Sequence, residues 1–271
     1  MTTATITPAR GWSWAGPKRA LTDSLVLTGR NLRHFQRQPQ LIIFSTIQPV
    51  MFVLLFSYVF GGAVEGALPE GVSYVDFLLP GILVQSVAFR SSQTAVGLSQ
   101  DLERGVIDRF RSMPMSRSAV LVGRTLADLV RNIFVLVLMI AVGYVVGFRF
   151  SQGPLDAVAS IAVVTLFGLA LSWIFAFVAL TVKGAEAAQS AGFVVLFPLV
   201  FASSIFVPTE SMPAWLQAFA DVSPVTATAD AARALAIGGD LGEPLLLTLI
   251  WVVGLLAIFV PLCAWRYRRL T

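Results

Sequence analysis

Long apolar stretches alternate with short charged segments along this chain, and six of the stretches are long enough to cross a membrane. A hydrocarbon core about 30 Å thick needs about 20 mostly apolar residues in a helix. The stretches that meet this length are residues 41–60, 77–99, 127–148, 157–182, 187–207 and 244–265. The second is the least apolar, because Arg90 interrupts it and Pro80 and Gly81 lie within it. The pattern predicts an all-α integral membrane protein with six transmembrane helices.

Charged residues are rare, and their positions are more informative than their sum. Only 13% of the residues are charged and the mean hydropathy is +0.80, whereas soluble domains are about a quarter charged. Of the 19 Lys and Arg residues, 15 fall in residues 1–40, 100–125, 183–186 and 266–271, and only Arg149 and Arg233 lie in the opposite loops. Because Lys and Arg favour cytoplasmic loops, both termini are expected in the cytoplasm. The net charge of +4 then reflects membrane orientation rather than nucleic-acid binding.

The chain divides into a cytoplasmic N-terminal segment, residues 1–40, a transmembrane domain, residues 41–265, and a basic cytoplasmic C-terminus, residues 266–271. In the first segment a helix is expected from Thr22 until Pro39 stops it. Two of its sides differ, one with Leu25, Thr28, Leu32 and Phe35, the other with Arg30, Arg33 and Arg37. This pattern favours a helix in the membrane interface, with its arginines toward anionic headgroups or a partner. A solvated juxtamembrane helix is the alternative.

The cytoplasmic connection after the second span also has an amphipathic pattern. Residues 101–114 are expected to form a helix that Pro114 ends, with an apolar stripe of Leu102, Val106, Phe110 and Met113. On the polar side, Asp108 is four residues from Arg104 and three from Arg111, a spacing at which charged side chains of a helix can pair. From the residues alone, an ordinary solvated loop helix is the favoured interpretation.

The external connection, residues 208–243, is long enough for two short helices. One is expected to begin near Pro213, and the other has Ser223 as its N-cap, Pro224 at its first position and Gly238 just after its end. Trp215 makes the segment apolar enough for re-entrant or surface helices against protein. An ordinary outer loop fits equally well.

The chemistry that the sequence lacks narrows the function. In the nearest match to a P-loop, Pro17 replaces the lysine and removes an amide donor, so no nucleotide site is expected. A single histidine, His34, and a single cysteine, Cys263, leave no metal motif and no internal disulfide. No carboxylate lies in spans one, four, five or six, so an ion-driven carrier is not indicated either. The chain shows no energy source of its own.

Three charged residues fall in or beside the predicted spans. Asp128 and Arg131 are expected in the opening turn of the third span, where they can pair with each other. Arg90 has the deepest predicted position. It either contacts an anionic substrate group or a gate partner, or it forms a structural salt bridge.

Three runs in the first half of the sequence resemble a known family: residues 80–85 (PGILVQ), 102–117 (LERGVIDRFRSMPMSR) and 123–128 (GRTLAD). They are similar to those of ABC-2 type transporter permeases, within them most of all the daunorubicin/doxorubicin-resistance exporter permeases of actinobacteria. The likeness extends over nearly the whole chain. It implies a permease dimer, of one chain or of two paralogues, in which each permease binds a separate ATP-binding subunit. ATP and Mg²⁺ would be used by that subunit, and this chain itself is expected to bind no cofactor or metal.

The resemblance also assigns roles to segments. The helix after span two is implied to be the coupling helix that docks on the ATPase, through Glu103, Arg104, Gly105, Asp108, Arg109 and Arg111. Residues 22–38 then look like the family's connecting helix, and residues 208–243 like its re-entrant external helices. This interpretation replaces the solvated loop helix, since an apolar stripe beside a charged edge suits a partner groove.

The function implied is export of a hydrophobic drug or lipid-like metabolite across the bacterial plasma membrane, with the chain as a transport subunit and not an enzyme. The candidate lining of the substrate pathway is Gln85, Phe89, Arg90, Phe193, Phe197 and Phe201. Phe193, Phe197 and Phe201 recur every four residues and share one helix face, which suits a flat amphiphile. Packing within the protomer, or contact with lipid, is an equally good interpretation of these phenylalanines. The alternatives for the whole chain are a permease for a lipid-linked polysaccharide and a membrane-embedded enzyme or scaffold.

Overall fold

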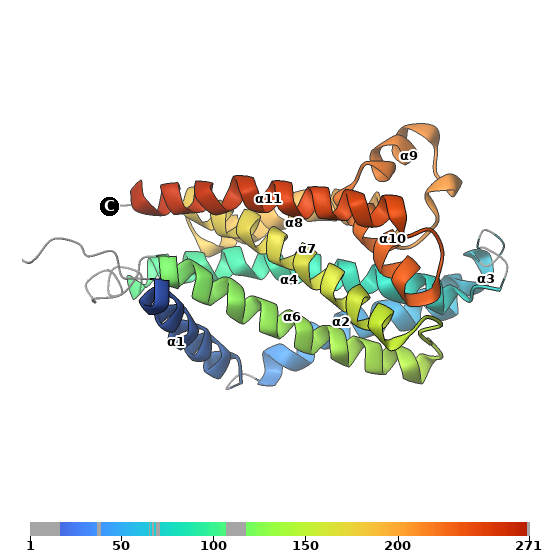
Figure 1. The fold of residues 1–271 in the computed structure, drawn as a ribbon, viewed down its shortest axis with the longest axis horizontal. Helices are drawn as coiled ribbons and strands as arrows, with labels where there is room; N and C mark the ends of the chain where they lie inside the picture. Colours follow the sequence, from blue (N-terminus) through green and yellow to red (C-terminus); the bar gives the residue numbers. More distant parts are fainter. Residues whose placement is uncertain are drawn as a thin grey trace, which may run out of the picture.

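The computed structural model describes residues 17–36, 39–64, 66, 68, 71–106 and 118–269, and every regular element in these ranges is helical. Figure 1 shows the helices as an elongated bundle. They are α1 (Pro17–Gln36), α2 (Pro39–Leu55), the π-helical turn η1 (Phe56–Phe60), α3 (Gly61–Val64), α4 (Tyr74–Glu103), α6 (Ser118–Val146), α7 (Pro154–Thr181), α8 (Ala185–Phe201), the 3₁₀ turn η3 (Thr209–Ser211), α9 (Ala214–Asp221), α10 (Pro224–Ile237) and α11 (Gly242–Arg269).

Three of the described helices contain segments long and apolar enough to cross a membrane by themselves. They are Leu121–Val146 in α6, Pro154–Thr181 in α7 and Gly242–Tyr267 in α11. Two shorter apolar helices, Ile47–Phe60 and Ala185–Phe201, lie where the first and fifth spans are predicted. The all-helical, membrane-spanning class is thus supported, and the number of six spans stays a prediction.

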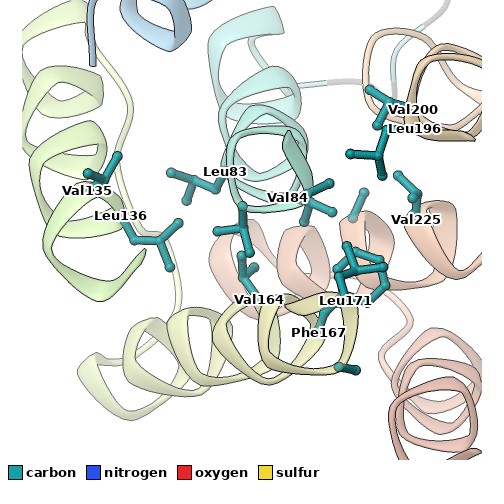
Figure 2. Close-up of a cluster of buried hydrophobic side chains, with 14 of the residues drawn as sticks. Leu83, Val84, Val135, Leu136, Val164, Phe167, Leu171, Leu196, Val200 and Val225 are labelled. Atoms are coloured by element: carbon teal, nitrogen blue, oxygen red, sulfur yellow. The ribbon is translucent and has the colours of Figure 1, made fainter. Parts of the chain in front are cut away.

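Helix α4 occupies the centre of the bundle and packs against α2, α6, α7, α8 and α10. Its 30 residues give a length of about 45 Å at about 1.5 Å per residue. In Figure 2, Leu83 of α4 lies near Val135 and Leu136 of α6, while Val84 lies near α8 and α10. Because protein rather than lipid surrounds α4, it carries serines and threonines that a lipid-facing helix would avoid. Central position therefore explains why the second span is the least apolar.

Glycines allow the closest approaches to α4. A Cβ on Gly168 of α7 would lie 2.1 Å from Cγ1 of Val87, and one on Gly143 of α6 would lie 2.3 Å from Leu79. The carbonyl oxygen of Gly168 accepts a hydrogen bond from Oγ of Ser91, 3.0 Å away. Small residues thus allow α6 and α7 to pack closely on α4, and an interhelical hydrogen bond adds to the contact with α7.

Helix α1 packs obliquely on the start of α6 (Figure 1). Its Thr28 is buried and donates to the carbonyl oxygen of Gly123, 3.2 Å away. Leu25, by contrast, is 57% exposed. Helix α6 thus covers Thr28 and leaves Leu25 outside, and the predicted place of this helix in the membrane interface stays a prediction.

The helix that follows the second span does not begin where the sequence predicts. Residues 101–103 continue α4, which ends at Glu103. Gly105 has a φ of +64° and its N–H donates to the carbonyl oxygen of Leu102, so a left-handed glycine ends the helix. Residues 107–117, which include most of the predicted coupling helix, lie outside the described residues.

Two further helix ends differ from the prediction. Helix α6 begins at Ser118, so Asp128 lies ten residues inside it and not in its opening turn. Helix α8 ends at Phe201, and the residues up to 207 leave helical geometry.

Both helices predicted in the external connection are present. The side chain of Ser223 accepts a hydrogen bond from the N–H of Val225, Pro224 opens α10, and Gly238 with a φ of +95° ends it. In Figure 1, α9, α10 and α3 lie at the end of the bundle opposite the C-terminus.

Candidate functional site

The three phenylalanines singled out on α8 lie along one half-exposed face. Phe193, Phe197 and Phe201 are 48%, 54% and 39% exposed. The rings of Phe197 and Phe201 are 4.4 Å apart between centroids. Phe89 of α4 meets Phe193 at 5.8 Å. The structure therefore brings four of the predicted pathway residues to one surface where α4 and α8 meet.

This aromatic face continues beyond the residues that the sequence analysis named. Phe201 stacks on Phe206 at 5.3 Å, Phe206 on Phe56 at 4.6 Å, and Phe56 on Phe60 at 5.1 Å. The face thus passes from α8 to the π-helical turn η1 at the end of the first predicted span. We call this set the aromatic face: Phe56, Phe60, Phe89, Phe193, Phe197, Phe201 and Phe206.

A signal for the missed part was present in the sequence. Phe52, Phe56 and Phe60 recur every four residues, the same spacing as in α8. Phe206 carried no such signal, because it lies after the end of α8. Its contact with Phe56 joins residues that are far apart in the chain.

Gln85 is buried beside this face, with 3% of its surface exposed. It lies one helical turn from Gly81, which contacts Ile205, and one turn from Phe89. Within the described part of the chain its Nε2 atom has no hydrogen-bond partner. A buried donor without a partner is costly to folding. The amide of Gln85 is therefore suited to donate to an oxygen of a molecule bound between α4 and α8.

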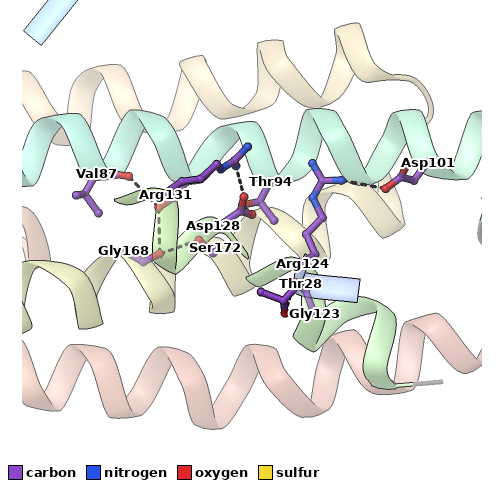
Figure 3. A network of polar contacts seen from close by, with 11 residues as sticks. Thr28, Val87, Thr94, Asp101, Gly123, Arg124, Asp128, Arg131, Gly168 and Ser172 are labelled. Carbon is purple, nitrogen blue, oxygen red and sulfur yellow. Dashed lines mark hydrogen bonds and ion pairs between the residues drawn. The ribbon is translucent and has the colours of Figure 1, made fainter. Parts of the chain in front are cut away.

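The charged residues in the spans form a cluster between α4 and α6 (Figure 3). Asp128 is buried; its carboxylate pairs with Arg131 and accepts a hydrogen bond from Oγ1 of Thr94, 2.6 Å away. Asp128 and Arg131 are also the charges that act on Arg90. The cluster joins two helices well inside their apolar length. The expected pairing of Asp128 with Arg131 is therefore present.

Nearer the start of α6, a second ion pair joins the same two helices. Nη1 of Arg124 lies 2.9 Å from Oδ2 of Asp101 (Figure 3). The Arg124 side chain crosses α4 over Gly97, where a Cβ would lie 1.6 Å from Nη2. Because Asp101 is two residues from the end of α4, this pair fixes that end against α6.

Glu103, assigned to ATPase coupling by resemblance, contacts α8 at this same end of α4. Its Oε1 accepts a hydrogen bond from the N–H of Ala185, 3.3 Å away, at the first residue of α8. A carboxylate is favourable there, because the start of a helix carries partial positive charge. The preceding Gly184 has a φ of +95°, so the chain turns sharply into α8 at this contact. Glu103 thus connects the end of α4 to the helix that carries the aromatic face.

The other predicted site residues are less informative. Arg104 follows the end of α4 and is exposed. Arg33 of α1 is exposed as well. The structure describes neither the side chain of Arg30 nor Arg37, Asp108, Arg109 and Arg111.

No metal site is apparent in the part of the chain that the structure describes: no three His, Cys, Asp or Glu residues there lie close enough to hold an ion. Cys263 is buried in α11.

Comparisons with known proteins agree with this architecture. The family model "ABC-2 type transporter" matches residues 22–237. The daunorubicin resistance ABC transporter permease protein DrrB1 of Streptomyces coeruleorubidus is 37% identical over 93% of this chain and 89% of its own length. The probable doxorubicin resistance ABC transporter permease protein DrrC of Mycobacterium tuberculosis is 27% identical over 92% and 89%. A putative transport permease, ycf38 of Cyanophora paradoxa, is 25% identical over 79% and 74%.

Proposed function

The chain belongs to the ABC-2 type transporter family, and from this premise we propose that it is the permease subunit of an ATP-driven exporter for a hydrophobic or amphiphilic drug or lipid-like metabolite. The observation that carries the substrate class is the aromatic face, with Phe193, Phe197 and Phe201 half-exposed, beside the unpartnered amide of Gln85. Two of the relatives are named for resistance to daunorubicin or doxorubicin. A flat aromatic amphiphile with oxygen acceptors fits such a surface.

The aromatic face lines the substrate pathway in this proposal. Offset stacking on a phenylalanine contributes about 0.5–1.5 kcal/mol beyond the burial of area. Stacking on phenylalanine accepts flat substrates of different shapes. Gln85 adds one directional hydrogen bond to a carbonyl or hydroxyl oxygen of the substrate. Exposed apolar residues also lie on α2 and α8, among them Met51 and Val194. A second permease copy, identical or paralogous, covers the face and encloses the pathway.

The energy comes from a separate ATP-binding subunit at the cytoplasmic side, where both termini lie. The segment after α4 docks on it, and Glu103, Arg104, Gly105, Asp108, Arg109 and Arg111 form the coupling residues. Glu103 supports a route into the membrane, since it contacts the start of α8. A displacement at the end of α4 then reaches the aromatic face through one hydrogen bond and one helix. The arginines of α1 face lipid headgroups at the same side of the membrane.

Co-purification tests the subunit assignment. The tagged chain is expected to retain an ABC ATPase in mild detergent, and the ATP hydrolysis of the complex is expected to rise when doxorubicin is added. Reversing the charges of Glu103 and Asp108 to lysine should abolish this stimulation. Reversal of exposed Glu210, which lies in η3, is the matched control and should leave stimulation unchanged. Intact stimulation in the Glu103 and Asp108 variants would refute the coupling assignment.

A further inference from the structure

Three basic side chains lie close together where α7 and α11 end, at the end of the bundle that carries the C-terminus (Figure 1). Nε of Arg266 donates to the carbonyl oxygen of Leu180, 3.2 Å away, one residue before the end of α7. Lys183 follows Leu180 by three residues, which is at most about 11 Å of chain. Arg269 follows Arg266 by one turn of α11, so the two side chains are neighbours on the helix surface. We call Lys183, Arg266 and Arg269 the basic patch.

The basic patch keeps its positive charge. None of its three side chains forms an ion pair with another described residue. Asp101 and Glu103 lie at the same end of the bundle, but Asp101 pairs with α6 and Glu103 accepts an N–H at the start of α8. Glu186 is exposed in the first turn of α8 and pairs with none of the three. Among the described residues Arg266 finds an acceptor only for Nε, so its Nη groups can bind an external anion.

An exposed tryptophan fixes one of the cations. The guanidinium carbon of Arg269 lies 4.2 Å from the centre of the Trp265 ring, a cation–π contact. Tryptophan rings are enriched at the level of the lipid headgroups, because one side of the ring is apolar and its N–H prefers water. Trp265 is 45% exposed and is therefore available to lipid. This contact holds Arg269 at the depth of the lipid phosphates.

An apolar face of α11 leads away from the basic patch. Trp251, Ile258 and Trp265 are spaced by seven residues, so they lie along one side of the helix, and all three are exposed. Gly254 lies between the first two, and a Cβ there would meet no atom within 4 Å. The described residues thus leave this side of α11 open along two turns on each side of Ile258. An acyl chain fits such a face, and its polar end would reach the basic patch.

From these observations we propose that the basic patch and the apolar face of α11 bind one anionic phospholipid. Its phosphate contacts Arg266 and Arg269, and one acyl chain lies along Trp251, Ile258 and Trp265. Guanidinium groups match the geometry of phosphate oxygens, and basic sites between transmembrane helices bind anionic headgroups. The lipid belongs to the cytoplasmic leaflet if the C-terminus is cytoplasmic, as proposed above. The inference goes beyond the proposed function, because binding requires neither the substrate nor the ATPase.

Lipid titration of the purified full chain tests this site. The chain is delipidated in detergent and titrated with dioleoyl phosphatidylglycerol or with dioleoyl phosphatidylcholine, and native mass spectrometry counts the lipids bound per chain. The first phosphatidylglycerol should bind about 25-fold more tightly than the first phosphatidylcholine, since each basic residue near an anionic lipid contributes about a factor of five.

Removing the cations should weaken only the anionic lipid. Arg269 has no hydrogen bond to a described residue, so Arg269→Gln should keep the fold and lower the affinity for phosphatidylglycerol about fivefold. Arg266→Gln together with Arg269→Gln should lower it about 25-fold. Phosphatidylcholine binding should stay the same in each variant, which shows that the protein remains folded.

Arg149 supplies a matched control. It is exposed and also lies over an aromatic ring, 5.1 Å from the centre of Tyr144, but its Nη1 donates to the carbonyl oxygens of Tyr144 and Phe148. Its own N–H donates to the carboxylate of Asp76. Arg149→Gln should therefore leave the affinity for phosphatidylglycerol unchanged.

Four results would overturn the lipid site. They are equal affinities for the two lipids, unchanged phosphatidylglycerol binding in the double variant, an equal loss in Arg149→Gln, and displacement of the lipid by inorganic phosphate. A double variant that binds phosphatidylglycerol normally but no longer retains the ATPase would make the basic patch a protein-docking surface instead. Loss of ATP-dependent efflux is not a readout here, so failure of the proposed function and failure of the lipid site are distinguished.

Discussion

Buried polar side chains among the described residues are of two kinds. Some have a partner for each polar atom, and others have an atom without a hydrogen-bond partner. Asp128 is buried and uses both carboxylate oxygens, one toward Arg131 and one toward Thr94. Gln85 is buried as deeply and leaves its Nε2 without a partner among the described residues. A structural residue and a binding residue therefore respond to mutation in opposite ways, and stability can be measured separately from transport.

Replacing Asp128 should destabilise the protein. Asp128→Ala leaves the Arg131 charge without its carboxylate, and breaking such a buried pair costs about 3–5 kcal/mol. Chemical unfolding in detergent measures the free energy of unfolding. Thr165→Val is the control, since the hydroxyl of Thr165 bonds only to Ile161 of its own helix and its loss should cost about 1 kcal/mol or less. Equal losses in the two variants would show that the ion pair adds no stability.

Replacing Gln85 should change transport without harming the fold. Gln85→Leu removes an unpartnered buried amide, so the free energy of unfolding should stay the same or rise. The apparent KM for doxorubicin efflux should increase about tenfold, because the substrate loses one buried hydrogen bond. Gln93→Leu, on the exposed side of the same helix, should leave the KM unchanged. A Gln85 variant that loses stability and keeps its KM would make Gln85 a structural residue.

Among the helices, α4 is the one against which most of the others pack. Its main contacts are with α2, α6, α7, α8 and α10, and it ends at Glu103, next to the start of α8. Its close contact with α7 depends on Gly168, and its contact with the segment after α8 depends on Gly81. Because packing around this helix is tight, we expect a shift at its Glu103 end to be transmitted to its neighbours.

Enlarging Gly168 should loosen the contact of α7 with α4. A methyl group in Gly168→Ala collides with Val87, and such overpacking costs about 1–3 kcal/mol. The further change Val87→Ala should restore part of the loss, since it removes the colliding methyl groups. Gly254→Ala in α11 meets nothing within 4 Å, so it should be neutral or stabilising by about 0.5–1 kcal/mol. Thermal unfolding is measured for the unmodified chain, the two single glycine variants and the double variant. If only Gly168→Ala lowers the stability, contact with α4 is the cause, and not the loss of a glycine in general.

Removing the Glu103 carboxylate should uncouple hydrolysis from export. Glu103→Ala loses the hydrogen bond to the N–H of Ala185, and export per ATP hydrolysed should fall about tenfold while basal hydrolysis persists. Glu103→Gln keeps an acceptor oxygen and should retain an intermediate level. Exposed Glu186, also at the start of α8, provides the control Glu186→Ala. Equal export by Glu103→Ala and the unmodified chain would remove α8 from the coupling route.

Over the whole molecule, the sequence predicted what local pattern determines. Ser223, Pro224 and Gly238 marked α10 correctly, because caps and prolines act within a few residues. Four-residue spacing placed Phe193, Phe197 and Phe201 on one face, as observed. ABC-2 membership was identified from residues 80–128, and the comparisons confirm it.

What sequence pattern missed depends on contacts between distant segments. The end of α8 at Phe201 follows from side chains of α4 and α10 that bind the next residues, so apolar sequence alone extended that helix too far. Phe206 joins the aromatic face only because Phe56 meets it. Each of these features is set by tertiary packing, which overrides local preference.

ATP-driven transport by the reconstituted complex tests the central claim most directly. Inverted proteoliposomes that contain the chain and its ATPase are given doxorubicin and ATP, and drug accumulation is measured for the unmodified chain and for Phe197→Ala. We predict accumulation that requires ATP hydrolysis, reduced about tenfold in Phe197→Ala through loss of stacking on the aromatic face. Phe134→Ala, which removes an exposed phenylalanine of α6 far from that face in sequence, should transport normally. Accumulation without ATP, none at all, or equal rates for Phe197→Ala and the unmodified chain would contradict the account.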